Sequence, residues 1–230
     1  MKLALIPAGK FTMGSPDSEK DHQASEGPQH EVTISKPFYM GAYEVTQEQY
    51  EQIMGKNPSN FKGPQNPVET VSWDDAVAFC QALSRKTGRT VRLPTEAEWE
   101  YACRAGTTTP FNTGETISTD QANYDGNYIY GNGRKGEYRQ KTIAVGSFKP
   151  NTFGLYDMHG NVWEWCSDWD GSYANANAVD PQGPGSVSYR VLRGGSWNYN
   201  PQNWRSAYRV RDDPDYRFSN YGFRVSVDLK

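Results

Sequence analysis

The segment from Asp157 to Glu164 combines residue types that bind a hard cation. A carboxylate precedes a glycine turn at Gly160, and the residues after the turn alternate as in a strand. Calcium takes six to eight oxygen ligands from carboxylates and backbone carbonyls alike. Asp157, the carbonyls of Gly160 and Val162, and Glu164 could therefore surround one calcium ion. A solvated turn, in which the two carboxylates accept backbone amides, fits the same residues equally well.

Other metal and catalytic motifs are missing from the sequence. The chain has three histidines, at His22, His30 and His159, and no two share a spacing suited to zinc or iron. There is no glycine-rich phosphate loop and no nucleophile elbow. The acidic pairs Asp74-Asp75 and Asp212-Asp213 are typical of a helix N-terminus and a loop.

The three cysteines, Cys80, Cys103 and Cys166, are scattered along the chain. Cys80 and Cys103 fall on the apolar faces of predicted helices, so we expect them to be buried and unreactive. An odd, sparse set of cysteines is typical of a reducing compartment and not of a disulfide scaffold. We therefore expect a cytoplasmic protein.

Composition limits the class of protein. The 230 residues carry a net charge of −3, which gives no electrostatic footprint for nucleic acid. The sequence has no apolar run long enough to cross a membrane. Hydrophobic residues make up only 36% of the chain, with 22 glycines and 14 prolines, so we expect much irregular structure. With no repeat and no linker, one domain over residues 1–230 is the simplest organisation, and we expect a monomer.

Regular elements are predicted mainly in the first half of the chain. Helices should begin after Thr46, Ser72 and Thr95 and end at Gly55, Gly88 and Gly106, because capping residues stand at both ends of each. Short strands are predicted at residues 3–6, 30–34 and 38–40. From Thr107 to Pro150 no helical or strand period is present, and a loop of that length needs a metal ion or many side-chain hydrogen bonds to hold it.

The C-terminal segment from Arg190 to Val225 has a different character. Two strand-like blocks, Val191–Trp197 and Gly222–Val225, enclose a stretch without helical or strand period that is crowded with Tyr, Trp, Asn, Asp and Arg. Loops of this mixture with rigid ends are typical of binding surfaces. An irregular aromatic core segment is the alternative.

Eight motifs in a fixed order resemble the formylglycine-generating enzyme (sulfatase-modifying factor) family. They span nearly the whole chain: Met13-Gly14, Tyr43–Thr46, Pro67-Val68, Val71–Trp73, Arg92–Tyr101, Gly160–Trp165, Arg193–Ser196 and Gly222–Arg224. The resemblance implies a C-type-lectin-like fold of the α+β class with little regular structure. It also implies calcium at two sites. The first uses Asp157, Gly160, Val162 and Glu164, and the second uses Asn123 and the Tyr124 carbonyl, with a partner near Glu137 or Tyr138.

The catalytic part of the family pattern is not present. The enzymes of this family place two cysteines after the Arg-Gly-Gly-Ser motif to bind copper, and this chain has Tyr199 and Trp204 at those positions. Neither residue supplies the thiolate that cuprous copper requires. We therefore expect no enzyme activity. A copper-dependent formylglycine-generating oxidase with displaced cysteines, acting on a cysteine of a sulfatase-like substrate, is the alternative.

Residues 194–225 are also similar to the variable region of proteins diversified by diversity-generating retroelements. In those systems error-prone copying at adenines changes Asn codons into codons for Tyr, Asp, Ser, Phe and Val. The resemblance implies a calcium-braced binding protein for a protein or other macromolecular ligand. The implied ligand-binding residues are Tyr199, Tyr208, Val210, Asp212, Asp213, Tyr216, Phe218, Ser219 and Tyr221.

The fixed positions between these residues should hold the segment's backbone. Five of them are arginines: Arg193, Arg205, Arg209, Arg217 and Arg224. A guanidinium has five donors in a planar fork that matches carboxylates and carbonyls, so we expect these side chains to fix the frame and not to contact a ligand. Trp204 is hard to reach from an Asn codon by changes at adenine, and we expect it to be a structural residue.

Overall fold

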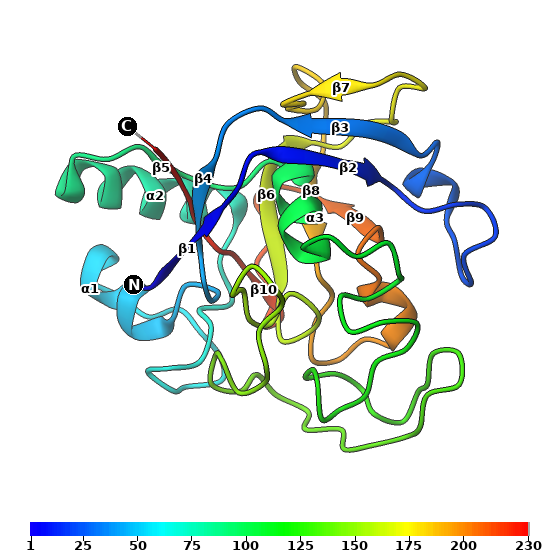
Figure 1. Cartoon of the computed structure of the whole chain (residues 1–230). Helices are drawn as coiled ribbons and strands as arrows, with labels where there is room; N and C mark the ends of the chain where they lie inside the picture. Colours follow the sequence, from blue (N-terminus) through cyan, green and yellow to red (C-terminus); the bar gives the residue numbers. More distant parts are fainter. Residues whose placement is uncertain (230) are drawn as a thin grey trace.

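A computed structural model describes residues 1–229 as an α+β domain with little regular structure, as predicted (Figure 1). The helices are α1 (Gln47–Met54), α2 (Trp73–Thr87) and α3 (Glu96–Arg104), with short 3-10 turns at Ala24–Glu26 and Pro201–Trp204. The strands are β1 (Leu3–Ile6), β2 (Gly9–Met13), β3 (His30–Ile34), β4 (Phe38–Gly41), β5 (Val91–Arg92), β6 (Trp163–Trp169), β7 (Ala178–Val179), β8 (Arg190–Arg193), β9 (Arg209–Asp212), β10 (Tyr221–Gly222) and β11 (Ser226–Asp228). Within residues 1–229, no helix combines the length and apolar character needed to cross a membrane.

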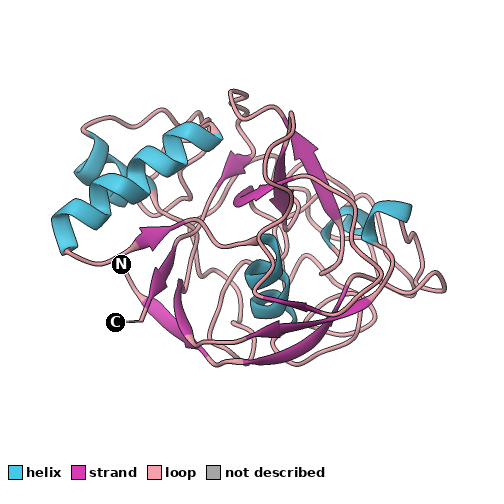
Figure 2. Ribbon diagram, turned by 90° about the horizontal axis from the view of Figure 1, so that it is seen from above, coloured by secondary structure: helices cyan, strands magenta, loops and turns pink. Residues whose placement is uncertain are grey.

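All three helices begin at the predicted caps. Thr46, Ser72 and Thr95 each accept a hydrogen bond from the third helical amide in a reciprocal capping box. Helices α1 and α2 end at left-handed glycines, as expected, whereas α3 ends one residue before the predicted Gly106, with Ala105 in the left-handed conformation. Figure 2 shows α1 and α2 together at one end of the molecule, near both termini, with loops filling most of the other end.

Three small sheets join segments that are distant in the sequence. Their strand orders are β1-β4-β11-β5, β2-β3-β7 and β10-β6-β8-β9. The third sheet contains the C-terminal segment, and its edge strand β9 lies where the sequence shows no strand period. That prediction was wrong because β9 has only four residues and forms by antiparallel pairing with β8.

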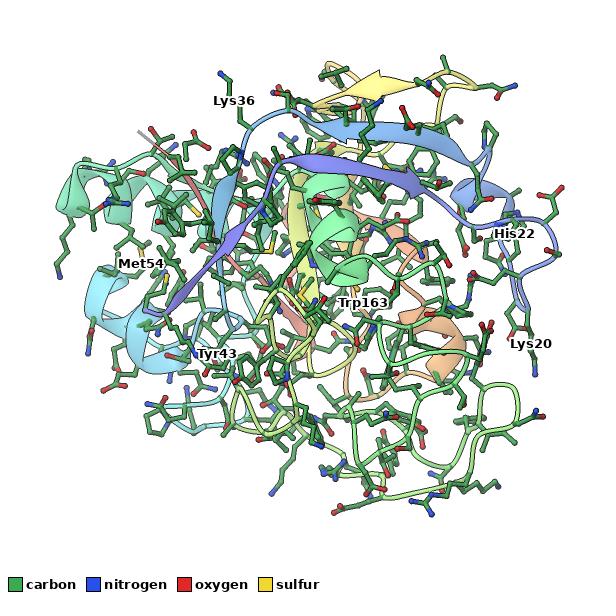
Figure 3. All side chains as sticks on the ribbon, in the orientation of Figure 1. Lys20, His22, Lys36, Tyr43, Met54 and Trp163 are labelled. Carbon is green, nitrogen blue, oxygen red and sulfur yellow. The ribbon has the colours of Figure 1, made fainter. Side chains whose placement is uncertain are left out.

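Two large hydrophobic clusters lie on either side of the central strands. In the first, α1 and α2 pack against Trp163, Trp165 and Phe223, and Figure 3 shows Trp163 inside the molecule. In the second, α3 packs with Trp99 and Cys103 against strands β2 to β4. Cys80, Cys103 and Cys166 are all buried and free, which confirms the expectation for the two helical cysteines.

Four of the five predicted frame arginines are buried in ion pairs with glutamates. Arg205 binds both oxygens of Glu26 at 2.6 Å, Arg209 binds both oxygens of Glu96 at 2.7 Å, and Arg224 binds both oxygens of Glu164 at 2.6 Å. Arg193 pairs with Glu100 and donates to the carbonyl of Ser206. Arg217 differs, because it pairs with Asp75 at the surface. The structural role predicted for these arginines is confirmed.

We expect Arg205→Met to lower the free energy of unfolding by about 3–5 kcal/mol, because it leaves Glu26 charged, buried and without its partner. Arg211→Met is the matched control. Arg211 also pairs with an aspartate, but its side chain is 62% exposed, so its loss should cost less than about 1 kcal/mol. Urea unfolding of both variants measures the difference, and equal losses would mean that burial of the pair does not matter.

A third, smaller cluster holds the loops between residues 107 and 140. Trp204 is completely buried there and packs edge-to-face on Tyr124, with ring centroids 4.4 Å apart. Gly195 lies directly against it: a Cβ on Gly195 would stand 1.7 Å from Cδ1 of Trp204. Trp204 is therefore a structural residue, as predicted, and Gly195 is needed for this close approach.

Gly195→Ala should destabilise the protein by about 3–5 kcal/mol, since it adds a clash to the cost of a left-handed residue. Gly88→Ala measures the cost of a left-handed alanine without the clash. Gly88 has a similar positive φ, +66° against +77°, but a Cβ added to it would meet no atom within 4 Å. Its replacement should cost only about 1–2 kcal/mol. Thermal unfolding of both variants measures the loss of stability. A small loss for Gly195→Ala as well as for Gly88→Ala would mean that the clash with Trp204 does not matter.

Candidate functional site

The sheet β10-β6-β8-β9 separates the predicted ligand-binding residues from the frame. Val210 in β9 stands opposite Leu192 in β8, which stands opposite Trp165 in β6, so these side chains share one face of the sheet. Arg209 and Arg193 are paired in the same ladder one residue away, and their side chains point to the other face. Alternation along the strands therefore places the side chains predicted to bind a ligand and the ion pairs on opposite sides.

Aromatic contacts extend this face beyond the strands. Tyr199 and Tyr208 pack on Trp163, with ring centroids 5.6 Å and 6.1 Å away. The rings of Tyr216 and Phe218 meet edge-to-face at 5.7 Å. Tyr199 is 39% exposed, Tyr216 49% and Phe218 48%, so apolar ring surface is open to solvent. Exposed rings grouped in this way are typical of interaction sites.

The loop that carries Tyr216 and Phe218 is held by hydrogen bonds at several points. Carboxylate oxygens of Asp212 and Asp213 accept the amides of residues 213 and 215. The carbonyls of Pro214 and Phe218 accept amides at the start of α2 and in the loop before it. The segment thus presents its side chains on a fixed backbone, which limits the entropy lost when a ligand binds.

Tyr221 is a correction to the predicted ligand-binding set. It is only 8% exposed, packs on Trp165, and donates its hydroxyl to Asp212 at 2.7 Å. It is buried because β10 pairs with β6 and brings its ring against the first cluster. The remaining residues are exposed or half-buried, and we call them the aromatic face: Tyr199, Tyr208, Val210, Asp212, Asp213, Tyr216, Phe218 and Ser219.

The first predicted calcium site lies next to the ion pair of Arg224. Oδ2 of Asp157 accepts the amide of Gly146 at 2.6 Å. Glu164 accepts from Arg224, and its Oε2 also accepts from Nε1 of Trp99 at 2.7 Å. Glu164 is buried and Asp157 is half-buried, and both carboxylates already accept hydrogen bonds from protein groups.

Glu44 belongs to this site and was missed from the sequence. Both of its carboxylate oxygens are buried without a hydrogen-bond partner. Burial raises the pKa of Glu44 well above its usual range, and the charges of Asp157 and Glu164 raise it further. Burial also raises the pKa of Asp157 to about 6. Three carboxylates thus surround the single positive charge of Arg224, and a bound cation would supply the missing charge.

The residues at this first site fit calcium only if backbone oxygens take part. Among residues 1–229 no three His, Cys, Asp or Glu side chains are grouped closely enough to hold a metal by themselves. The unpartnered oxygens of Glu44 fit a hard cation, as do the carbonyls expected of Gly160 and Val162. Glu44 belongs to the Tyr43–Thr46 motif, but that motif does not indicate a cation-binding role for Glu44. Only the folded chain brings Glu44 near Asp157.

The second predicted site also contains an unpaired oxygen, here from an amide side chain. Asn123 is buried, and its Nδ2 donates to the carbonyl of Lys141 and to Oδ1 of Asn161, but its Oδ1 has no partner. An isolated bridge between Asp125 and Tyr138 brings the segment of Glu137 and Tyr138 beside residues 123–125. An unpaired amide oxygen beside two backbone segments fits an oxygen-coordinated cation.

The positions of the two family cysteines hold aromatic residues in this chain. Tyr199 belongs to the aromatic face, and Trp204 fills the third cluster. Sγ of Cys103 lies 3.7 Å from Nε2 of His159, but burial raises the pKa of this thiol to about 12 and lowers the pKa of His159 to about 4. The pair is a neutral, buried contact.

Comparison with known proteins agrees with this architecture. Residues 2–229 match the sulfatase-modifying factor enzyme 1-like domain. The chain is 33% identical to the formylglycine-generating enzyme of Mus musculus, over 99% of this chain and 75% of that protein. It is also 31% identical to the serine/threonine-protein kinase pkn1 of Chlamydia pneumoniae, over 99% of this chain but only 38% of the kinase.

Solved structures show the same similarity. PvdO from Pseudomonas aeruginosa superposes with a TM-score of 0.85 at 35% identity, covering 99% of this chain and 94% of PvdO. Treponema denticola variable protein 1 superposes with a TM-score of 0.83 at 31% identity, covering 99% of this chain and 95% of that protein. The motifs, the fold and these comparisons show that the chain belongs to the family of sulfatase-modifying factor enzyme 1-like domains.

Proposed function

We propose that this protein is a non-catalytic binding protein, the variable protein of a diversity-generating retroelement, and that its aromatic face binds a protein or other macromolecule. The observation that carries the proposal is the alternation in β9. Residues reachable from Asn codons by changes at adenine, such as Val210 and Asp212, stand on one side of the strand. Arg209 stands on the other side in a buried ion pair.

This arrangement allows side chains to vary without loss of the fold. Apart from the half-buried Tyr208 and Val210, the aromatic face adds little to the hydrophobic clusters. Tyrosine and phenylalanine supply large contact area at low entropic cost, and aspartate and serine supply adaptable hydrogen bonds. The similarity to Treponema denticola variable protein 1, whose name describes variability, supports the same interpretation.

A copper-dependent oxidase is the second candidate, since formylglycine-generating enzymes are among the relatives. Two observations count against it. Trp204 occupies one cysteine position as part of a packed cluster. The three cysteines of the chain are buried, and burial raises the pKa of Cys80 and Cys103 to about 12, so neither forms a thiolate at neutral pH.

The double variant Tyr216→Ala/Phe218→Ala should lose binding at unchanged stability. As a probe we choose linear peptides selected on the wild-type protein from a random phage-displayed library, because such peptides concentrate on natural binding surfaces. We expect most of them to bind the variant at least about 30-fold more weakly, as at a hot spot, while Tm changes by less than about 2 °C.

The control for this experiment is Tyr128→Ala/Ile129→Ala, which removes two similarly exposed apolar side chains outside the C-terminal segment. It should leave peptide binding unchanged. A large fall in Tm for the Tyr216/Phe218 variant would place that segment in the core, and unchanged peptide binding would show that the aromatic face is not the recognition surface.

We further propose that calcium is the cofactor that braces the loops, with the ligand groups described above. Calcium at a hundredfold excess over its Kd should raise the free energy of unfolding by about 2.7 kcal/mol, and EDTA should reverse the effect.

Glu44→Gln should weaken calcium binding at least tenfold in isothermal titration calorimetry. Glu115→Gln, at a carboxylate outside both sites, should not. Thermal stability that does not respond to calcium would refute the proposal.

A further inference from the structure

Asp168 on β6 is a buried carboxylate without a basic partner. Its residue is only 4% exposed, yet within residues 1–229 no Lys, Arg or His nitrogen lies within 4 Å of it. Oδ2 accepts the amide of Glu96 at 2.9 Å and the hydroxyl of Ser167 at 3.0 Å. The buried glutamates around it, Glu96, Glu100 and Glu164, all pair with arginines. Asp168 thus has no ion-pair partner within 4 Å, whereas its neighbours have one; Arg190 acts on it from beyond that distance and donates instead to the carbonyl of Ser167.

Asp168 lines a cavity of about 410 Å³ on the frame side of the sheet, away from the aromatic face. Arg209 lines this cavity, whereas Tyr208 and Val210 do not. The segment around β7 forms part of its wall, and in Figure 1 this segment (yellow) lies beside β3 at the top of the molecule. A volume of this size matches sites for small organic molecules and far exceeds the space of a single ion.

The other charged groups in the cavity are already paired. Both oxygens of Glu96 bind Arg209, and Oε1 also accepts the hydroxyl of Tyr173 at 3.2 Å. The same arginine donates to the carbonyl of Gly171 at 2.8 Å. His30 also lines the cavity, but its ring packs on Tyr173 and its Nδ1 contacts the carbonyl of Pro28 at 3.0 Å. Asp168 is therefore the carboxylate that remains to recognise a ligand, and its sign selects a cation.

The remaining walls favour an organic cation over a metal ion. Alanine methyl groups, including those of Ala97 and Ala178, and the rings of Trp169 and Tyr173 line the cavity. Each of these rings already carries an arginine over one face, Arg190 over Trp169 at 3.4 Å and Arg209 over Tyr173 at 4.5 Å, so these rings are suited to contact with cations. Among residues 1–229 no group of three acidic, histidine or cysteine side chains stands ready for a metal.

We propose that this cavity is a second binding site, independent of the aromatic face, for a small primary ammonium ion with a short apolar body, whose nitrogen is held by Asp168. The ammonium group supplies the missing counter-charge, and the alanine and ring surfaces bury the apolar body. Burial and the charge of Glu96 raise the pKa of Asp168 to about 7, as expected for a carboxylate that lacks this partner.

Three four-carbon probes of similar size test the proposal on the full chain at pH 8: butylammonium, butan-1-ol and butyrate. We expect butylammonium to bind at least tenfold more tightly than either of the others, measured by chemical-shift titration of the backbone amides, with the largest shifts at residues 168–178. Equal affinity for the three would mean that the cavity is merely apolar, and no binding of butylammonium would overturn the proposal outright.

Asp168→Asn keeps the shape and an oxygen that accepts the amide of Glu96, and it should reduce butylammonium binding at least tenfold. Asp120→Asn, at an exposed aspartate remote from the cavity in the sequence, is the matched control and should leave binding unchanged. If Asp168→Asn fails to fold, Ala178→Leu provides the test, because it fills the cavity without changing its charge. Butylammonium binding that survives in the folded Asn variant, or in Ala178→Leu, contradicts the assignment.

Discussion

The structure depends on ion pairs between buried arginines of the C-terminal segment and glutamates far away in the sequence. Arg205 and Glu26 are 179 residues apart, Arg209 and Glu96 are 113 apart, and Arg224 and Glu164 are 60 apart. Each pair joins this segment to a different part of the chain. Removal of one partner leaves an uncompensated buried charge, which costs about 3–5 kcal/mol. These contacts, together with the backbone hydrogen bonds of β9 and β10, hold the segment in place.

The ion pairs lie on one side of the sheet, and the other side carries the first hydrophobic cluster with Tyr208 and Val210 at its margin. A strand puts successive side chains on opposite faces, so one short strand can carry both frame residues and residues of the aromatic face. Arg209 and Val210 are neighbours in sequence and belong to these two different parts. The family membership of the chain explains the frame, whereas the function that we propose depends on the aromatic face.

Features set by local sequence were predictable, and features set by long-range pairing were not. Thr46 and Thr95 predicted the starts of two helices because capping depends on residues three positions apart. The structural role of the arginines followed from their chemistry, but their glutamate partners did not, because nothing in the sequence shows which acid lies near which arginine. Glu44 was missed for the same reason. Tyr221 was placed on the surface because its pairing with Trp163 in the third sheet leaves no trace in the sequence.

The central claim is that the aromatic face is diversified and the frame is not, and the DNA around the gene tests it most directly. The account predicts an imperfect copy of the segment that encodes residues 194–225, next to a reverse-transcriptase gene. Mismatches at adenines should fall in codons of the aromatic face, such as Tyr216 and Phe218, and spare those of Arg205 and Arg209. Absence of such a copy, or mismatches concentrated in the arginine codons, would contradict the account.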